Sequence, residues 1–353
     1  MARSLFILCI FMCYLNFDAQ NLPLYVGTYT NGDSEGIYQL QFNTKTGELK
    51  NLKLAAEIEN PSFITYSPDK QHIYAVSESL GGTVSAFKVQ PSGSLQFLNK
   101  LSSNGTAPCH IATNQAGDKA VVSNYGGGSA SIYTLSKDGR LLNTFQTFNF
   151  NTLDKISHAH SAQFLKDELF IADLGTNAVY QYILKNDKYV LETPNLVAMP
   201  GNPGPRHFAI TKNGQYIYVI NEYGGSVTSI KRTSSGFEQI DFDNTLDENY
   251  RGKNSCADIH LSKNEDYLYG SNRGENSIVV FSRNKRDGTL EKIQTVPVRG
   301  DWPRNFTLDP TGKFLLVANQ NSNNISVFNI DSSSGKLTFL QSIKAPSPVC
   351  LLF

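Results

Sequence analysis

Short apolar runs alternate with clusters of turn residues along the chain, and no stretch keeps the 3.6-residue apolar period of an amphipathic helix. Residues 204–211 and 216–220 are one pair of such runs, and the Lys-Asn-Gly-Gln segment between them has the composition of a tight turn. The pattern predicts an antiparallel hairpin, whose two free ends lie at the same edge of a sheet. Arg206, near the first end, and Glu222, just after the second, are therefore expected on one face.

The hairpin recurs along the chain. Comparable pairs of runs cover residues 61–78, 108–125, 158–174, 204–222, 256–273 and 303–320. A third run follows each pair and ends in a hydrophobic residue, and these residues are spaced 46, 49, 48, 51 and 47 apart: Phe87, Tyr133, Tyr182, Ile230, Phe281 and Phe328. A repeat of this length, built from short strands, is typical of the blades of a β-propeller, which grows as one domain by adding blades.

One further repeat is incomplete at the N-terminal end. Residues 24–30, 36–42 and 49–59 match the second, third and fourth strands of a blade, and residues 346–353 match a first strand. Six complete repeats and one blade shared between the two ends of the chain make seven blades. We therefore predict an all-β, seven-bladed β-propeller closed by pairing of the C-terminal strand with N-terminal strands, a join that removes open sheet edges.

Residues 1–20 have the features of a secretory signal peptide: Arg3 at the start, an apolar stretch over residues 5–15 and a cleavage region at residues 18–20. The apolar stretch is short for a membrane span. We expect an exported protein, periplasmic or extracellular, that has no membrane span after cleavage and forms the propeller from residues 21–353. If the signal is not used, the protein is cytoplasmic.

The charge is balanced, with 31 basic and 31 acidic residues among 353, and no Lys/Arg-rich run indicates a nucleic-acid partner. We expect a monomer that acts on a small molecule. Cys109, Cys256 and Cys350 remain after the signal peptide, so at least one of them is unpaired. All three lie at the starts of predicted first strands, and we interpret them as small packing residues rather than as nucleophiles.

The repeat sorts the polar residues by face. First-strand starts and second-strand ends should share one face, and five of the six histidines fall there together with arginines, carboxylates and amides: Glu78, His110, Asn124, His158, His160, Asp173, Arg206, His207, Glu222, Asp258, His260, Arg273, Arg304, Asn305 and Gln320. Histidine, arginine and carboxylate side chains around one channel mouth suit acid–base chemistry on an anionic substrate.

Several of these residues also have a structural interpretation. Asparagine recurs at nearly one place in four blades, where it is expected to fix the loop after the second strand, as Asp173 would in a fifth: Asn124, Asn221, Asn272 and Asn319. His110 and His207 could be core histidines, and Asp258 with His260 could bridge adjacent blades. Four other residues depart from the repeat, so the scaffold does not require them: His158, Arg206, Glu222 and Arg273.

No cofactor or metal site is predicted. His158 and His160 would point to one face of a strand, as metal ligands can, but the spacing supplies no third ligand. The sequence has no Gly-x-Ser-x-Gly elbow, Walker loop or dinucleotide fingerprint. Residues 145–157 and 241–255 lengthen two connections between blades on the predicted site face, where they either shape a binding site or are tolerated insertions.

The site motifs form a specific set. They are His-Ala-His-Ser at 158–161, Gly-Pro-Arg-His-Phe at 204–208 with Asn-Glu at 221–222, Asp-Ile-His-Leu-Ser at 258–262 with Ser-Asn-Arg-Gly at 271–274, and Pro-Arg-Asn-Phe at 303–306. Together they resemble the bacterial lactonase family of seven-bladed propellers. That family includes the propeller type of 6-phosphogluconolactonase and is similar to fungal carboxymuconate-lactonizing enzymes. The resemblance covers essentially the whole chain after residue 20.

The resemblance implies hydrolysis of a sugar lactone ring to the free acid, with 6-phosphoglucono-δ-lactone or a related aldonolactone as substrate. It implies that the catalytic residues are His158, Arg206, Glu222 and Arg273, and we assign substrate binding to His160, His207, Asp258, His260 and Arg304. The arginines would hold an anionic group or polarise the carbonyl. His158 or Glu222 would take a proton from the attacking water.

Two other functions remain open. The same mouth could bind a sugar acid, a glycan or a protein without catalysis, since propellers serve both purposes, or it could carry out an isomerisation of the muconate-lactonizing type. The predicted export also bears on the substrate. A phosphorylated sugar lactone is unexpected outside the cell, whereas an unphosphorylated aldonolactone from carbohydrate breakdown is not.

Overall fold

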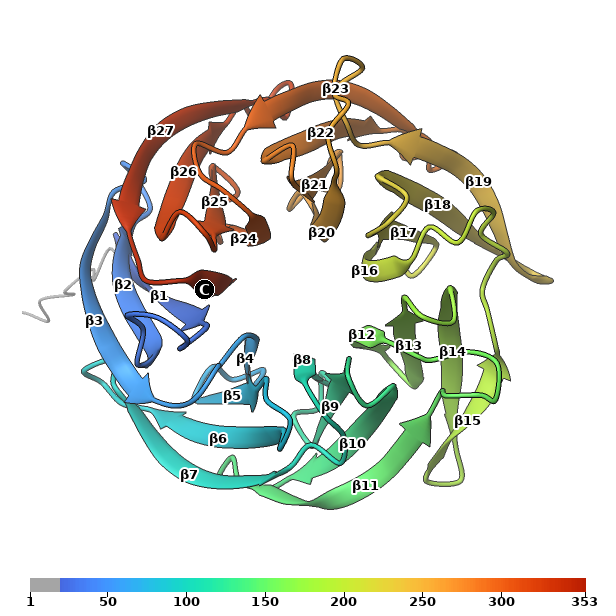
Figure 1. Ribbon diagram of the computed structural model, residues 1–353, viewed down its shortest axis with the longest axis horizontal. Helices are drawn as coiled ribbons and strands as arrows, with labels where there is room; N and C mark the ends of the chain where they lie inside the picture. Colours follow the sequence, from blue (N-terminus) through green and yellow to red (C-terminus); the bar gives the residue numbers. More distant parts are fainter. Residues whose placement is uncertain (1–19) are drawn as a thin grey trace, which may run out of the picture.

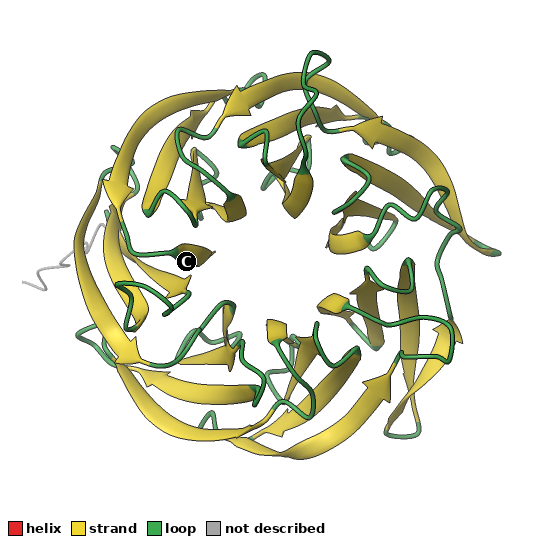
Figure 2. Cartoon of the chain, in the orientation of Figure 1, coloured by secondary structure: helices red, strands yellow, loops and turns green. Residues whose placement is uncertain are grey.

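The structure is a computed structural model in which residues 20–353 are described. They form 28 strands in seven four-stranded antiparallel sheets, and no helix occurs within this range (Figure 2). The sheets stand as blades around a central axis (Figure 1). The predicted all-β, seven-bladed propeller is confirmed. The predicted signal peptide lies outside the described residues, apart from its last position.

Each blade runs from a first strand at the axis to a fourth strand at the rim. The first strands are β4 (Ile64–Tyr66), β8 (Pro108–Thr113), β12 (Ala159–Leu165), β16 (Pro205–Ile210), β20 (Ser255–Leu261), β24 (Pro303–Leu308) and β28 (Pro348–Leu352). The second strands are β5 (His72–Ser77), β9 (Lys119–Asn124), β13 (Glu168–Asp173), β17 (Tyr216–Asn221), β21 (Tyr267–Arg273), β25 (Phe314–Asn319) and β1 (Asn21–Thr28). The third strands are β6 (Thr83–Val89), β10 (Ser129–Leu135), β14 (Ala178–Lys185), β18 (Ser226–Thr233), β22 (Ser277–Arg283), β26 (Asn324–Ile330) and β2 (Gly36–Asn43). The fourth strands are β7 (Leu95–Ser102), β11 (Leu141–Asn149), β15 (Lys188–Thr193), β19 (Gly236–Asn244), β23 (Leu290–Pro297), β27 (Leu337–Lys344) and β3 (Leu49–Glu57).

One blade is built from both ends of the chain. β28 pairs with β1, with Val26 opposite Leu351 and Gly27 opposite Cys350, and β1 continues into β2 and β3. Figure 1 shows the C-terminus at the inner edge of this blade. Gly27 lies so close to the next blade that a Cβ there would collide with the Pro61 carbonyl oxygen, so glycine is required. The predicted closure is confirmed, and it pairs the inner edge of β1.

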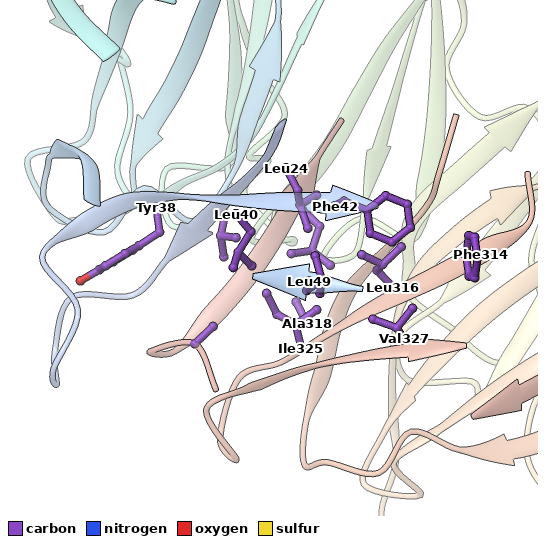
Figure 3. Close-up of a cluster of buried hydrophobic side chains, with 13 residues drawn as sticks. Leu24, Tyr38, Leu40, Phe42, Leu49, Phe314, Leu316, Ala318, Ile325 and Val327 are labelled. Carbon is purple, nitrogen blue, oxygen red and sulfur yellow. The ribbon is translucent and has the colours of Figure 1, made fainter. Parts of the chain in front are cut away.

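The hydrophobic core lies between the blades. Buried apolar residues form seven clusters, and each cluster draws on two neighbouring blades. Figure 3 shows the cluster in which Leu24, Leu40 and Phe42 of the closing blade pack with Leu316 and Val327 of the β24–β27 blade. Because each blade buries apolar side chains against both neighbours, its stability depends on the ring as a whole.

The first strands carry bulges at the end nearest the site. In six of them the register with the second strand slips by one residue, and in β16 the slip lies between Pro205 and His207. A bulge leaves one residue unpaired and re-aims the side chains beside it. Arg206 is that residue in β16, and Arg206 and His207 both line the central channel. A regular strand would present only every second side chain there.

Two details of the sequence interpretation are wrong. The six repeated hydrophobic residues, Phe87 and its counterparts, do not end the third strands: each strand continues for two or three residues, and the register with the fourth strand slips at that point. The long connections are residues 150–158 and 245–254, since the earlier parts of both predicted segments belong to β11 and β19. A third long connection, residues 194–204, was not predicted.

Candidate functional site

Arg206, Glu222 and Arg273 form a charged clamp at one mouth of the channel. The Glu222 carboxylate accepts a hydrogen bond from Nε of Arg206 at 2.9 Å and lies 3.0 Å from a terminal nitrogen of Arg273. Arg206 also donates to the carbonyl oxygen of Ala257 at 2.6 Å, and Arg273 donates to two other carbonyl oxygens of β20. The hairpin β16–β17 brings Arg206 to Glu222, as predicted, and the neighbouring blade supplies Arg273.

Burial sets the charges of the clamp. Arg206 is 1% exposed and Arg273 is 4% exposed. Burial lowers the pKa of both guanidinium groups and Glu222 opposes this shift, so both remain cationic at neutral pH. Burial alone would raise the pKa of Glu222, but the two arginines hold it below its ordinary value. A carboxylate stabilised in this way is a weak base, so Glu222 is better suited to fixing the arginines.

Arg304 forms a second, looser ion pair at the same mouth. One of its terminal nitrogens lies 3.6 Å from Oε2 of Glu78, and its guanidinium lies 5.4 Å from the centre of the Tyr29 ring. The Tyr29 hydroxyl donates to the same Glu78 oxygen at 2.8 Å. Within residues 20–353 the side chain of Arg304 makes no hydrogen bond and keeps 16% exposure. The side-chain donors of Arg304 are therefore all available to an incoming anion.

His158 is half-buried beside Tyr125. The two rings stack with their centres 4.4 Å apart, and Nδ1 of His158 lies 3.1 Å from the Tyr125 carbonyl oxygen. A carbonyl oxygen only accepts hydrogen bonds, so Nδ1 carries the proton and Nε2 is left as an acceptor. The backbone N–H of His158 donates to Asp173 at 2.8 Å. The direct contacts of His158 are therefore with Tyr125 and Asp173 rather than with the clamp.

His160 lies deeper in the channel. A cavity of about 10 Å³ is lined by His160, Arg206 and Arg304, with Ser62 and His207 also on its wall. His160 is 4% exposed, and its ring centre lies 5.1 Å from that of His207. Burial and the nearby Arg206 lower the pKa of His160 well below its ordinary value. His160 is thus a neutral imidazole under the clamp.

His207 and Asn305 line both this small cavity and a larger one of about 250 Å³, which Asp258 also lines. Asp258 accepts hydrogen bonds from Nδ1 of His207 at 2.8 Å, Nε2 of His260 at 3.0 Å and Nδ2 of Asn305 at 2.5 Å. Burial alone would raise the pKa of Asp258, but the histidines hold it well below its ordinary value. Burial and Arg206 lower the pKa of His207 to about 4. Asp258 therefore bridges blades, as one of its two sequence interpretations proposed.

The face predicted for His260 is wrong. His260 is the last residue but one of β20, and it lines the larger cavity together with Gln163 and Ile210, which lie near the far ends of their own strands. A first strand runs the length of the channel, so only its first residues reach the mouth that carries the clamp. The structure therefore brings Arg206, Glu222 and Arg273 into contact and leaves His260 toward the opposite face.

The structural interpretations of the asparagines and cysteines hold. The four asparagine side chains donate to a serine hydroxyl of the following third strand at 3.0–3.1 Å: Asn124 to Ser129, Asn221 to Ser226, Asn272 to Ser277 and Asn319 to Ser326.

Cys109, Cys256 and Cys350 are free and buried, and burial raises the pKa of their thiols to about 12, 11 and 12. Thiols held protonated in this way serve packing.

Two aromatic residues of the site escaped the sequence interpretation. Tyr125 supports His158, and Trp302 lies 5.3 Å beneath the Arg273 guanidinium. Trp302 has a φ of 65°, which is rare for an aromatic residue. Its backbone N–H donates a hydrogen bond to Oδ1 of Asn276 at 2.9 Å. The sequence could have indicated both residues, because strand ends of this kind lie on the predicted site face. Tyr125 directly follows a predicted second strand, and Trp302 directly precedes a predicted first strand.

In residues 20–353 no group of three or more His, Cys, Asp or Glu side chains is arranged to hold a metal ion. The same range contains no helix that is long and apolar enough to cross a membrane.

The fold and the site define a seven-bladed propeller with an arginine–glutamate clamp at one channel mouth. Residues 23–353 match the model of the family described as "Lactonase, 7-bladed beta-propeller", and the chain belongs to this family. The resemblance inferred from the site motifs is confirmed.

The relatives carry related names. Proteins called 6-phosphogluconolactonase from Formosa agariphila and Bacillus subtilis are 36% identical over 332 residues and 31% identical over 341 residues. The two alignments cover 89% and 93% of this chain and 94% and 97% of the relatives. The solved structure of a periplasmic gluconolactonase from Pseudomonas aeruginosa is similar with a TM-score of 0.87 at 29% identity, covering 93% of this chain and 98% of that one.

Proposed function

We propose that the protein hydrolyses the ring ester of a sugar lactone, with 6-phosphoglucono-δ-lactone as the first candidate and an unphosphorylated aldonolactone as the second. The clamp of Arg206, Glu222 and Arg273 carries the proposal. With the Arg304–Glu78 pair, the mouth holds three arginines and two glutamates, an excess of one positive charge that favours an anion. The names of the two relatives and of the periplasmic gluconolactonase support this assignment.

The geometry suits a hydrolysis without a covalent intermediate. Nε2 of His158, left unprotonated by the bond from Nδ1 to Tyr125, takes a proton from a water molecule whose oxygen attacks the lactone carbonyl. Arg206 and Arg273 stabilise the oxyanion that develops on the carbonyl oxygen. The ring C–O bond then breaks, and its oxygen takes the proton back from His158. Arg304, which has free donors, holds the anionic group of the substrate.

The proposal is tested by acid release from purified protein given fresh 6-phosphoglucono-δ-lactone or glucono-δ-lactone, with the spontaneous rate subtracted. Faster opening of the phosphorylated lactone supports the first candidate, and opening of the plain lactone alone supports the second. No acceleration of either would contradict lactone hydrolysis and favour a propeller that binds without turnover.

The role of the clamp is tested by Arg206→Lys. Lysine keeps the charge but lacks the two separate nitrogens, Nε and Nη1, by which Arg206 binds Glu222 and Ala257, so we expect kcat/KM to fall by about 100-fold. Arg232→Lys is the matched control, because Arg232 makes a two-point ion pair with Glu168 at 2.9 and 2.8 Å near the far end of β18. An equal loss in both variants would show that general destabilisation, and not the clamp, is responsible.

A further inference from the structure

The small cavity under Arg206 is lined by polar atoms that have no protein partner. Within residues 20–353, Oγ of Ser62, Nδ1 of His160 and Nε2 of His207 are buried and make no hydrogen bond, and all three residues line this cavity. The residues are 3%, 4% and 7% exposed. A buried polar group without a partner costs about 1–3 kcal/mol. Three such atoms around one space indicate that a polar molecule occupies it.

Size and charge restrict the occupant. The cavity of about 10 Å³ is close to the minimum that holds one water molecule. The ions around it are already paired: Arg206 with Glu222, Arg304 with Glu78, and Asp258 with His207 and His260. A further ion would remain uncompensated in a buried site. We propose that a single buried water molecule fills the cavity and joins Ser62, His160 and His207.

The neighbours of the water fix the direction of its hydrogen bonds. The ionised Asp258 only accepts, so Nδ1 of His207 donates to it at 2.8 Å and Nε2 of His207 is an acceptor. The Ser62 hydroxyl has no acceptor among the described protein atoms and donates to the water. The water then gives one hydrogen to His207 and the other to Nδ1 of His160. The reverse arrangement, with His160 donating, would leave either one hydrogen of the water or the Ser62 hydrogen without an acceptor among these atoms.

This network determines the tautomer of His160. Because its Nδ1 accepts from the water, the proton of the neutral imidazole is on Nε2. Within residues 20–353 Nε2 also lacks a protein partner, but it is not among the enclosed atoms, and the ring lies 5.8 Å from that of Tyr125. His160 therefore presents a neutral N–H donor toward the mouth. Asp258, His207, Ser62 and the water are the groups that position it.

The kinetic consequence rests on the proposed lactone hydrolysis, whereas the water site does not. An N–H donor beside the arginines can bind the developing oxyanion of a lactone more strongly than the carbonyl of the ground state. Loss of the network should therefore lower kcat and leave KM nearly unchanged. Ser62, His207 and Asp258 would act only through His160, as positioning residues.

The test reads the tautomers directly. In the full-length protein with ¹⁵N-labelled histidine, two-bond ¹⁵N–¹H spectra at neutral pH should give the Nδ1–H form for His207 and the Nε2–H form for His160. Ser62→Ala removes one of the three partners of the water, so the ¹⁵N signals of His160 Nδ1 and His207 Nε2 should shift, while His160 keeps the Nε2–H form. Ser229→Ala is the matched control, because Ser229 also carries a buried hydroxyl without a partner but lies on β18 away from the channel.

Each outcome decides the inference. The Nδ1–H form of His160 in the unmodified protein, or His160 and His207 signals unaffected by Ser62→Ala, would overturn it, as would an empty cavity in a high-resolution crystal structure. With a lactone that the protein opens, Ser62→Ala should lower kcat up to about tenfold with KM unchanged, the worth of one hydrogen bond. If no lactone is opened, the proposed function fails while the tautomer result still decides the water site.

Discussion

Burial divides the channel histidines into two kinds. Burial lowers the pKa of His110 and His160 well below the ordinary value and that of His207 to about 4. The side chain of His260 keeps 40% exposure; burial opposes its protonation, but the Asp258 carboxylate raises its pKa. The three buried rings are therefore neutral hydrogen-bonding groups at pH 7, next to arginines that repel a fourth positive charge.

The neutral histidines make the fold sensitive to acid. Their folded-state pKa values lie below the unfolded value of about 6.5, so the unfolded chain takes up protons first as pH falls. Their contribution to stability is complete above that pH and is lost as pH falls toward the folded-state values. Each contributes a slope of up to about 1.4 kcal/mol per pH unit. His260, whose pKa is raised, stabilises the fold below pH 6.5 and loses this contribution as pH rises through its folded-state value.

His110→Asn tests this linkage. An asparagine oxygen can replace Nδ1, which accepts from the Ala162 N–H at 3.4 Å, while the titrating group is removed. We expect the free energy of unfolding, measured with urea between about pH 6 and pH 5, to fall less steeply with acid by up to about 1.4 kcal/mol per pH unit. An unchanged slope would mean that His110 is protonated in the folded protein.

At the scale of the strand, one substitution pattern separates the His158 blade from the others. Asp173 stands near the end of the second strand, at a position that is asparagine in four other blades. Its partner on the third strand is Ala178. In three of those four blades the partner of the asparagine is a serine: Ser129, Ser226 and Ser277. Because Ala178 has no hydroxyl to accept a hydrogen bond from an asparagine amide, position 173 carries a carboxylate, which only accepts hydrogen bonds. It binds the Ser157 hydroxyl at 2.5 Å and the His158 N–H at 2.8 Å. Asp173 thus fixes the loop that presents His158.

Asp173→Asn should loosen this loop. Asparagine keeps only one of the two acceptor oxygens and its amide nitrogen cannot accept, so we expect a loss of about 1–3 kcal/mol in stability and a fall in lactonase kcat of about tenfold. The double variant Asp173→Asn with Ala178→Ser restores the hydrogen bond of the other blades. It should recover stability, measured by thermal unfolding, without recovering kcat. Recovery of both would assign Asp173 to the scaffold alone.

Strand geometry explains what the sequence predicted and what it missed. Hairpin pairing placed Arg206 beside Glu222 because antiparallel strands joined by a tight turn bring their free ends together. His260 was assigned to the wrong face because it was grouped with Asp258 at the start of the first strand, whereas it is the last residue but one of β20. The bulge that turns both Arg206 and His207 into the channel has no clear sequence signal, since it depends on the pairing register. Contacts between blades, such as Trp302 under Arg273, depend on tertiary packing.

At the scale of the molecule, closure of the ring supports the site. The clamp joins two blades through the contact of Glu222 with Arg273, and the Asp258 network joins three, so small rotations of the blades would separate the charges. β28 completes the ring, because Leu351 and Cys350 enter the clusters on its two sides. The precision of the site therefore depends on a strand that contributes none of the clamp residues.

Deletion of residues 348–353 tests this dependence. Val349, Cys350 and Leu351 are 1%, 2% and 5% exposed, and losing their burial should cost about 5 kcal/mol, enough to lower Tm by about 10 °C. A peptide of residues 346–353 added in excess should restore Tm and lactonase activity by pairing with β1, and the same peptide with Leu351→Asp should not. If the truncated protein melts like the intact one, the contacts between blades hold the ring without the strand. If it regains Tm but not activity with the peptide, closure serves stability alone, and the clamp must be aligned by its own two blades.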